Sequence, residues 1–270
     1  TLAYNTYITS YNTNMVTNEV FIDSATLREN VVSLARNVGY LPRSRKAPVC
    51  NISFSVDVSG TTATTVTLKA GIVAISSKQD NLRTANLVFS IANDITVGVD
   101  SDGYANFLDI DIYQGTLITQ TFNVSSRNKN QRFILPNPGI DTSLMRVTVK
   151  ESSTSTVQRT FQQFDSLFEV NNNSPIYFVQ EIDSERYEIM FGDGVFGVAV
   201  QEPNFIEVNY IITDGEDGNR VSGVRFAGSL RDNNGNTISG GVSLITVNDP
   251  SYGGSSIESV ESIKKFATQI

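Results

Sequence analysis

The amino-acid sequence predicts an α+β protein, in which a mainly antiparallel β domain of sandwich or open barrel-like form is flanked by helical segments at both ends. Apolar residues recur at helical spacing near both ends of the 270 residues, and from about residue 50 the apolar period changes to two. Turn-forming sequences then separate many short strands with no helix between them. This arrangement favours antiparallel sheets over a βαβ fold.

Two helices are predicted within the first 40 residues. The first covers residues 2–21, where Thr and Asn lower the helix propensity. In the second, Ser24 is a candidate N-cap, because its hydroxyl oxygen can accept a backbone N–H that has no helical partner. Gly39 suits the left-handed residue past the helix end, and Pro42 blocks continuation. The apolar stripe of the second helix comprises Leu27, Val31, Leu34, Ala35 and Val38, and all of these except Ala35 are expected in helix–helix or interchain contacts.

A further helix is predicted at the C-terminal end. Ser255 and Glu258 have the S-x-x-E spacing of a capping box, in which two side chains satisfy backbone N–H groups of the first turn. The chain begins at Thr1 rather than Met and stops inside this helix, so we expect a piece of a longer protein. The apolar stripe of this helix comprises Ile257, Val260, Ile263 and Ala267, and the first three are also expected in helix–helix or interchain contacts.

The sequence between the helical ends predicts many short strands. In residues 51–58, Ile, Phe and Val alternate with small polar residues, which is typical of a half-buried strand. The sequence DNNGN at 232–236 is a strong hairpin signal, and NDPSYGGSS at 248–256 is expected to end the sheet. Further strands are expected at 64–69, 86–91, 105–113, 116–124, 132–136, 144–150 and 157–164.

Length and composition indicate one or two globular domains. Hydrophobic residues make up 40% of the chain and charged residues 18%, which suits a packed, β-rich protein rather than a disordered one. We expect a helical arm or bundle segment at 1–45 and a β-rich domain at 46–252, with a division into two β subdomains near 165–175 as one option. Residues 253–270 would begin a further helical segment.

The charge and the reactive residues exclude several classes of function. The net charge of −8 opposes binding to duplex nucleic acid, and the basic run of Arg43, Arg45 and Lys46 is interpreted as a solvated connector. No apolar run is long enough for a membrane span. The chain has no histidine, so a Ser-His-Asp or Cys-His catalytic unit is excluded within it. Cys50, the single cysteine, is interpreted as a small buried hydrophobe.

The sequence MFGDGVFG at 190–197 contains the G-x-G-x-x-G pattern of a dinucleotide-binding turn. That site requires a helix directly after the glycines, because the helix N-terminus holds the pyrophosphate. The following residues are β-branched, interrupted by glycine and broken by Pro203, so no helix is expected. We therefore predict a hairpin, with Asp193 in the turn and a strand on each side, and no cofactor.

Acidic residues cluster in two turns and on one strand. The groups are DSDG at 100–103 and DGEDGN at 214–219, which we interpret as turns rather than calcium sites because neither completes a calcium-binding loop. Asp109 and Asp111 share one strand face. They could be the two carboxylates of a glycosidase, but the simpler interpretation is a solvated strand face. We therefore expect no catalytic and no metal-binding residue.

Several segments, in this order and spacing, resemble the baseplate J-like wedge proteins of contractile-tailed bacteriophages. The helical opening at 2–44, the FGDG turn, the GEDGN turn and the YGGSSIESVESIKKFA segment carry the resemblance. The middle of the chain matches only in its β character, and AVQEPN at 199–204 departs from the turn of many relatives. The turn residues that match are Gly192, Asp193, Gly194, Gly197, Gly215, Gly218, Asn219, Gly253 and Gly254.

The resemblance implies a non-enzymatic structural subunit of the virion, located in the tail baseplate and assembled in the host cytoplasm. It implies pairing with a second copy and with other wedge subunits in the inner baseplate ring, and a part in transmitting the trigger for contraction. Cofactors, small-molecule substrates, nucleic acid and membrane contact are not implied. Related contractile secretion and bacteriocin machines contain similar subunits.

Two rival functions fit parts of the sequence. A β-sandwich module of a tail fibre or adhesin that recognises glycans would suit the strand number and the many Asn, Thr and Ser residues. It would show an exposed aromatic cluster with converging polar groups. A glycosidase that uses Asp109 or Asp111 is the third option, and activity abolished by Asp109→Asn would support it.

Overall fold

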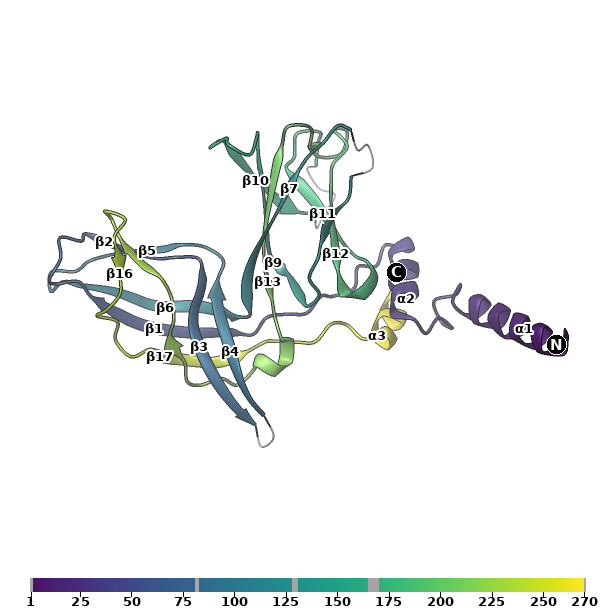
Figure 1. Cartoon of the computed structure of the whole chain (residues 1–270), viewed down its shortest axis with the longest axis horizontal. Helices are drawn as coiled ribbons and strands as arrows, with labels where there is room; N and C mark the ends of the chain where they lie inside the picture. The colour runs from purple at the N-terminus through teal and green to yellow at the C-terminus, as the bar shows by residue number, and fades with distance from the viewer. Residues whose placement is uncertain (1, 81–82, 128–130, 165–169, 270) are drawn as a thin grey trace.

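The computed structural model describes residues 2–80, 83–127, 131–164 and 170–269. Two β units form the body, and the helices gather at one end, where α1 (Leu2–Asn18) projects away from the rest of the chain (Figure 1). Helices α2 (Arg28–Asn37) and α3 (Val260–Ala267) pack on each other. This mainly antiparallel α+β architecture, with helices at both chain ends, confirms the predicted fold class.

The first β unit encloses an apolar core to which a six-stranded and a four-stranded sheet contribute. Inward side chains alternate along its strands, and the rings of Phe54 and Phe107 stack with centroids 4.8 Å apart. The larger sheet has the order β14 (Arg225–Phe226), β3 (Gly71–Asp80), β4 (Arg83–Ile91), β6 (Tyr104–Gln114), β1 (Val49–Asp57) and β17 (Thr246–Tyr252). The smaller has the order β16 (Thr237–Ile238), β15 (Leu230–Asp232), β2 (Thr65–Leu68) and β5 (Ile95–Gly98).

The second β unit is a seven-stranded sheet that curls into a near-barrel around its own core. The two end strands approach each other, because the ring of Phe122 on β7 meets that of Phe133 on β8 edge-on at 5.5 Å. All neighbouring strands are antiparallel except β10 and β11. The order is β7 (Thr116–Asn123), β13 (Phe205–Ile212), β9 (Ile140–Lys150), β10 (Gln158–Gln163), β11 (Ile176–Glu181), β12 (Tyr187–Phe191) and β8 (Phe133–Leu135).

The second β unit is inserted into the first. The core of the first unit ends at Ile112 along the chain and resumes at Val221, with the core of the second unit in between. The chain returns through the 3-10 helix η2 (Gly215–Gly218). The subdomain division considered near 165–175 falls between β10 and β11 and lies partly outside the described residues.

Most predicted strands agree with the structure, and the differences are confined to a few places. The expected strand after the GDG turn is absent, because the described residues 192–204 form no strand. The sheet does not end at Pro250, because β17 continues through it to Tyr252 at the sheet edge, where a proline is tolerated. Strands β3, β5 and β14 were not predicted. In β3 a register shift between Ile72 and Ala74 breaks the period of two.

The helix ends follow the sequence at Gly39 but not at the two predicted N-caps. Gly39 has φ +86°, and its N–H and that of Tyr40 donate to the carbonyls of Arg36 and Ala35, which is a Schellman motif. Ser24 is not an N-cap, because α2 begins at Arg28 and the Ser24 hydroxyl donates to the Asn18 carbonyl instead.

The capping box predicted from Ser255 and Glu258 is also wrong. Ser259 is the N-cap of α3, and its hydroxyl accepts the N–H of Ser262. Ser255 forms a β-bridge with Lys46, so the segment before α3 is extended rather than helical. The carboxylate of Glu258 is used for contacts with another part of the chain, as described below.

Candidate assembly sites

The structure brings two of the predicted turn groups together at the junction between the β units. The side-chain amide of Asn219 donates to the Gly254 carbonyl at 3.0 Å, and its carbonyl oxygen accepts the Gly254 N–H at 2.9 Å. The buried amide of Gln114, at the end of β6, accepts the Thr213 hydroxyl and donates to the Asp214 carboxylate. The GEDGN and GGSS segments therefore form one packed corner with the end of β6.

Glycine is required at this corner by close approach of the backbone. A Cβ atom on Gly254 would lie 2.7 Å from the Gly215 carbonyl oxygen and would also meet the Pro48 ring. A Cβ on Gly218 would lie 2.8 Å from the Gln114 side chain. Gly215 and Gly253 have φ values of +66° and +80°, which L side chains rarely adopt. Packing and backbone conformation thus explain the four glycines without a ligand.

Replacing Gly254 by alanine is expected to lower the free energy of unfolding by about 1–3 kcal/mol, because the backbone on both sides must shift. The matched control is Gly223→Ala, since a Cβ there meets nothing within 4 Å and Gly223 does not have a positive φ. Urea titration followed by circular dichroism would measure both variants. Equal midpoints for the two variants would contradict the close-packed corner.

Helices α2 and α3 form a small core of their own, and the predicted interface stripes only partly coincide with it. Val31 and Ile263 are fully buried, and Leu34 and Val260 pack beside them half-buried. Leu27 and Val38 are 56% and 50% exposed, and Ile257 is half-buried outside this core. Of the other buried members on these helices, Ala35 and Ala267 belong to the predicted apolar stripes, whereas Val32 was not predicted.

Glu258 ties the helical pair to the chain segment that follows α2. Its side chain is buried, and its carboxylate accepts hydrogen bonds from the Tyr40 hydroxyl at 2.8 Å, the Arg43 N–H at 2.9 Å and the Ser262 hydroxyl at 2.6 Å. Burial alone would raise the pKa of this carboxyl, but the hydrogen bonds outweigh it and the pKa is lowered. The carboxylate therefore stays ionised and joins α3 to the segment that follows α2.

Helix α1 is exposed along its whole described length. Every residue from 4 to 18 is exposed, and the helix carries no charged side chain. Tyr4, Ile8, Tyr11 and Met15 recur at helical spacing, and Tyr7 adds to the same apolar surface. Most helices in proteins depend on tertiary packing for their stability, and α1 in addition contains four Thr and four Asn, which lower its helix propensity. A partner surface would supply the stabilisation that the chain itself does not give to α1.

The GDG turn lies at one end of the near-barrel, away from the packed corner. Asp193 accepts the N–H groups of Val195 and Phe196 at 2.9 and 2.8 Å, and these bonds hold the pKa of its carboxyl below the usual value. A Cβ on Gly192 would collide with the backbone of Phe196 and Gly197. No helix follows in the described residues 198–214. The glycines therefore shape a compact loop rather than a phosphate site.

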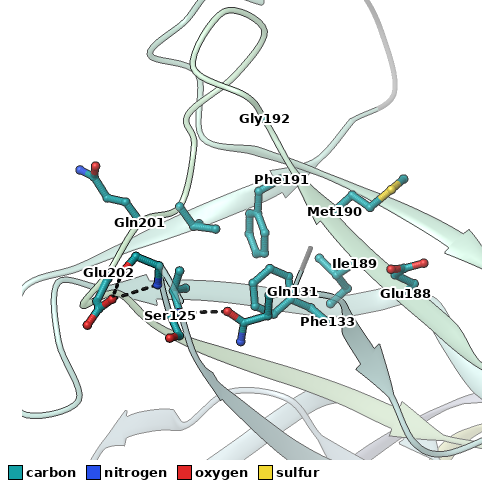
Figure 2. Close-up of a pocket in the computed structure, with 13 residues that line it drawn as sticks. Ser125, Gln131, Phe133, Glu188, Ile189, Met190, Phe191, Gly192, Gln201 and Glu202 are labelled. Carbon is teal, nitrogen blue, oxygen red and sulfur yellow. Dashed lines mark hydrogen bonds between the residues drawn. The ribbon is translucent and has the colours of Figure 1, made fainter. Parts of the chain in front are cut away.

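This loop borders a pocket of about 490 Å³ (Figure 2). Phe133 and Phe191 supply apolar surface, and Glu202 is held at the rim by the N–H and hydroxyl of Ser126. The amide of Gln131 accepts the Ser125 N–H and donates to the Asn123 carbonyl, so it links the ends of β7 and β8. Most polar side chains at this pocket are thus already hydrogen-bonded to other groups of the same chain.

The remaining chemical candidates are engaged locally. Asp109 accepts a hydrogen bond from Asn248, and Asp111 accepts one from Asn51, both on the exposed face of the first unit and outside the pocket in Figure 2. Among the described residues, no three His, Cys, Asp or Glu side chains converge as metal ligands. Cys50 is buried, and burial raises the pKa of its thiol to about 11. Within the same residues, no helix combines the length and the apolar character that crossing a membrane requires.

Comparison with known proteins supports a structural class. No family model matches the chain. Over almost its whole length, however, the chain is similar to a structural component of a phage baseplate, and this supports a structural, baseplate wedge-like protein of the virion tail. The relative is the baseplate wedge protein gp6 of Enterobacteria phage T4, with 23% identity over 291 residues. The alignment covers 99% of this chain and 41% of the relative, so the chain spans less than half of the relative's length.

Proposed function

We propose that this chain is a baseplate J-like structural subunit of a contractile-tail baseplate wedge. It builds the inner baseplate ring by pairing with a second copy and with other wedge proteins, and it transmits the trigger for contraction. It acts in the virion after assembly in the host cytoplasm. The similarity to a wedge protein supports a structural role in the baseplate. The exposed helix α1 is the observation that supports pairing with another chain.

The fold suggests a division of labour within such a subunit. Residues 1–45 and 253–270 supply docking helices, and residues 46–252 form a spacer of two interlocked β units. The Asn219–Gly254 corner joins the β units directly to the segment that leads into α3. A force applied to the helices therefore reaches both β units through packed, hydrogen-bonded backbone rather than through a free linker.

The alternative role in glycan recognition has less support. The pocket in Figure 2 has aromatic surface, but both polar ends of the Gln131 amide are already bonded within the chain. Phe164, Phe178 and Phe196 form a half-exposed cluster of aromatic rings near the GDG loop. The nearby Asp193 carboxylate is not free to bind a sugar hydroxyl, because it accepts backbone N–H groups of its own turn. A glycan array that shows specific binding would favour this alternative.

Lysine substitutions on α1 test the pairing. We expect the 270-residue chain to self-associate with rising concentration, and Tyr7→Lys/Tyr11→Lys to weaken this at least about tenfold, because two adjacent apolar contacts become charged. The matched control is Leu108→Lys/Leu244→Lys, which adds the same charge at exposed apolar residues of the first β unit. Sedimentation equilibrium provides the measurement. Pairing through α1 is wrong if both double variants behave alike or if the parent chain stays monomeric.

A map of the intact assembly by cryo-electron microscopy tests the place of the subunit. The proposal expects this chain in a ring of paired copies at the base of the tail, with α1 covered by another chain. A peripheral trimer at the tip of a fibre would contradict the wedge role and favour the glycan-binding alternative.

A further inference from the structure

The helical pair α2/α3 is attached to the β body by a narrow two-stranded connection. Lys46 and Ser255 exchange backbone hydrogen bonds of 3.1 Å in both directions, and the Glu258 N–H donates to the Arg43 carbonyl at 3.2 Å. The apolar core of the pair is separate from the cores of both β units. The pair is therefore a small rigid body on a paired stalk rather than a continuation of the barrel core.

The contacts between the pair and the near-barrel are ionic and polar. The guanidinium of Arg28 binds the Glu181 carboxylate in a bidentate manner, with N–O distances of 2.8 and 2.9 Å, and also donates to the Glu258 carbonyl. Arg36 donates to the Gln180 side chain at 2.9 Å. Beside these bonds, a cleft of about 360 Å³ separates α2 from β11 and is lined mainly by charged and polar side chains. Separation would expose little apolar surface.

The near-barrel side of this contact carries buried polar groups whose hydrogen bonds are incomplete in the structure. Glu181 is only 3% exposed, and among the described residues Arg28 is its ion-pair partner. Tyr187 lies directly opposite Glu181 on β12, and its buried hydroxyl has no hydrogen-bond partner in the described chain. Opening the contact would expose the Glu181 carboxylate, which lines the cleft, to water, and this offsets part of the loss of the Arg28 bonds.

We propose that Arg28 and Glu181 form a releasable latch, which holds the helical pair against the near-barrel and lets it swing on its stalk when the ion pair breaks. The closed arrangement is the one in the structure, and the open one keeps α2 and α3 packed on each other. The latch belongs to the single chain, so it holds whether or not the chain pairs with a second copy. In an assembly, it would allow docked helices and β body to change their mutual angle.

Pulsed electron–electron double resonance on the full 270-residue chain, which measures the distance between two spin labels, tests the latch. Spin labels at Asn37→Cys on α2 and Thr160→Cys on β10 report the distance between the two bodies, and both positions are exposed. Cys50 stays unlabelled because it is fully buried. Dilution with unlabelled protein removes distances between chains, so the result does not depend on pairing.

Arg28→Gln is expected to increase the ratio of open to closed molecules about tenfold, because it removes a charge-assisted bidentate contact. The matched control is Lys150→Gln, which breaks the 3.1 Å ion pair of Lys150 with Glu207 between β9 and β13 of the near-barrel, away from the cleft, and should leave the distance unchanged. Salt at 1 M should broaden the distance distribution of the parent chain towards that of Arg28→Gln. An unchanged distance in Arg28→Gln, or equal broadening in Lys150→Gln, overturns the latch.

A second variant decides the question if Arg28→Gln loses its helical circular dichroism. Glu181→Gln removes the charge on the barrel side of the latch and leaves α2 unchanged, so it should also shift the equilibrium towards the open distance. A shift towards the closed distance, or no shift, contradicts the proposal.

Discussion

Replacing Glu258 by alanine is expected to lower the free energy of unfolding of the helical pair by about 2–4 kcal/mol. The substitution leaves the Tyr40 hydroxyl, the Arg43 N–H and the Ser262 hydroxyl without their acceptor in a partly buried site. The loss is local, because the core of the pair is separate from the cores of the β units. Hydrogen exchange of α2 and α3 should therefore accelerate while β1 and β9 stay protected.

The matched control for this prediction is Glu261→Ala, which removes an exposed carboxylate from the first turn of the same helix. It should change the opening free energy of α3, measured by hydrogen exchange, by no more than a few tenths of a kcal/mol. Similar acceleration in both variants would mean that Glu258 acts only through helix charge and not as a buried acceptor.

Acidification provides a second readout of Glu258. Its pKa is lowered in the folded chain, so its contribution to stability is present above the ordinary glutamate pKa of 4.5 and is lost as the pH falls through the lowered folded value. The parent chain should therefore lose more protection in α2 and α3 below pH 4.5 than Glu258→Gln does. Identical pH profiles would show that this carboxylate is not the group that titrates.

The local signals in the sequence were sufficient for most strands. The alternation of Ile52, Phe54 and Val56 matches the inward face of β1, because a half-buried strand exposes every second side chain. The DNNGN turn likewise joins β15 and β16 as a hairpin. Strand β3 was missed because Val73 and Ala74 are both buried next to a register shift, so its period is not two.

The errors at the two helix starts have different physical causes. Ser24 has a suitable residue type, but its hydroxyl binds the nearby Asn18 carbonyl, whereas distant partners use the segment around Ser255. Ser255 pairs with Lys46, and Glu258 binds Tyr40 and Arg43, which follow α2 in the sequence. These contacts join residues more than 200 positions apart, and no local pattern reports them. For the same reason, the Arg28–Glu181 contact could not be predicted from the sequence.

Replacing Ile263 by aspartate is expected to unfold the helical pair, with a loss of more than about 4 kcal/mol in its local stability, because an unpaired charge enters a fully buried site. The core of the pair has six fully or almost fully buried members among the described residues, so it has little reserve for such a change. Phe266→Asp is the matched control, since Phe266 is on the same helix but 41% exposed.

The consequence for assembly separates two roles of the helices. If α1 alone carries pairing, Ile263→Asp should lose the helical signal of α2 and α3 and still self-associate as the parent chain does. If the docking surface includes the predicted stripes of α2 and α3, self-association should fall together with that signal, while Phe266→Asp affects it less. Far-ultraviolet circular dichroism and sedimentation equilibrium on the same samples distinguish these outcomes. Parallel loss of the β signal would instead contradict the independence of the three cores.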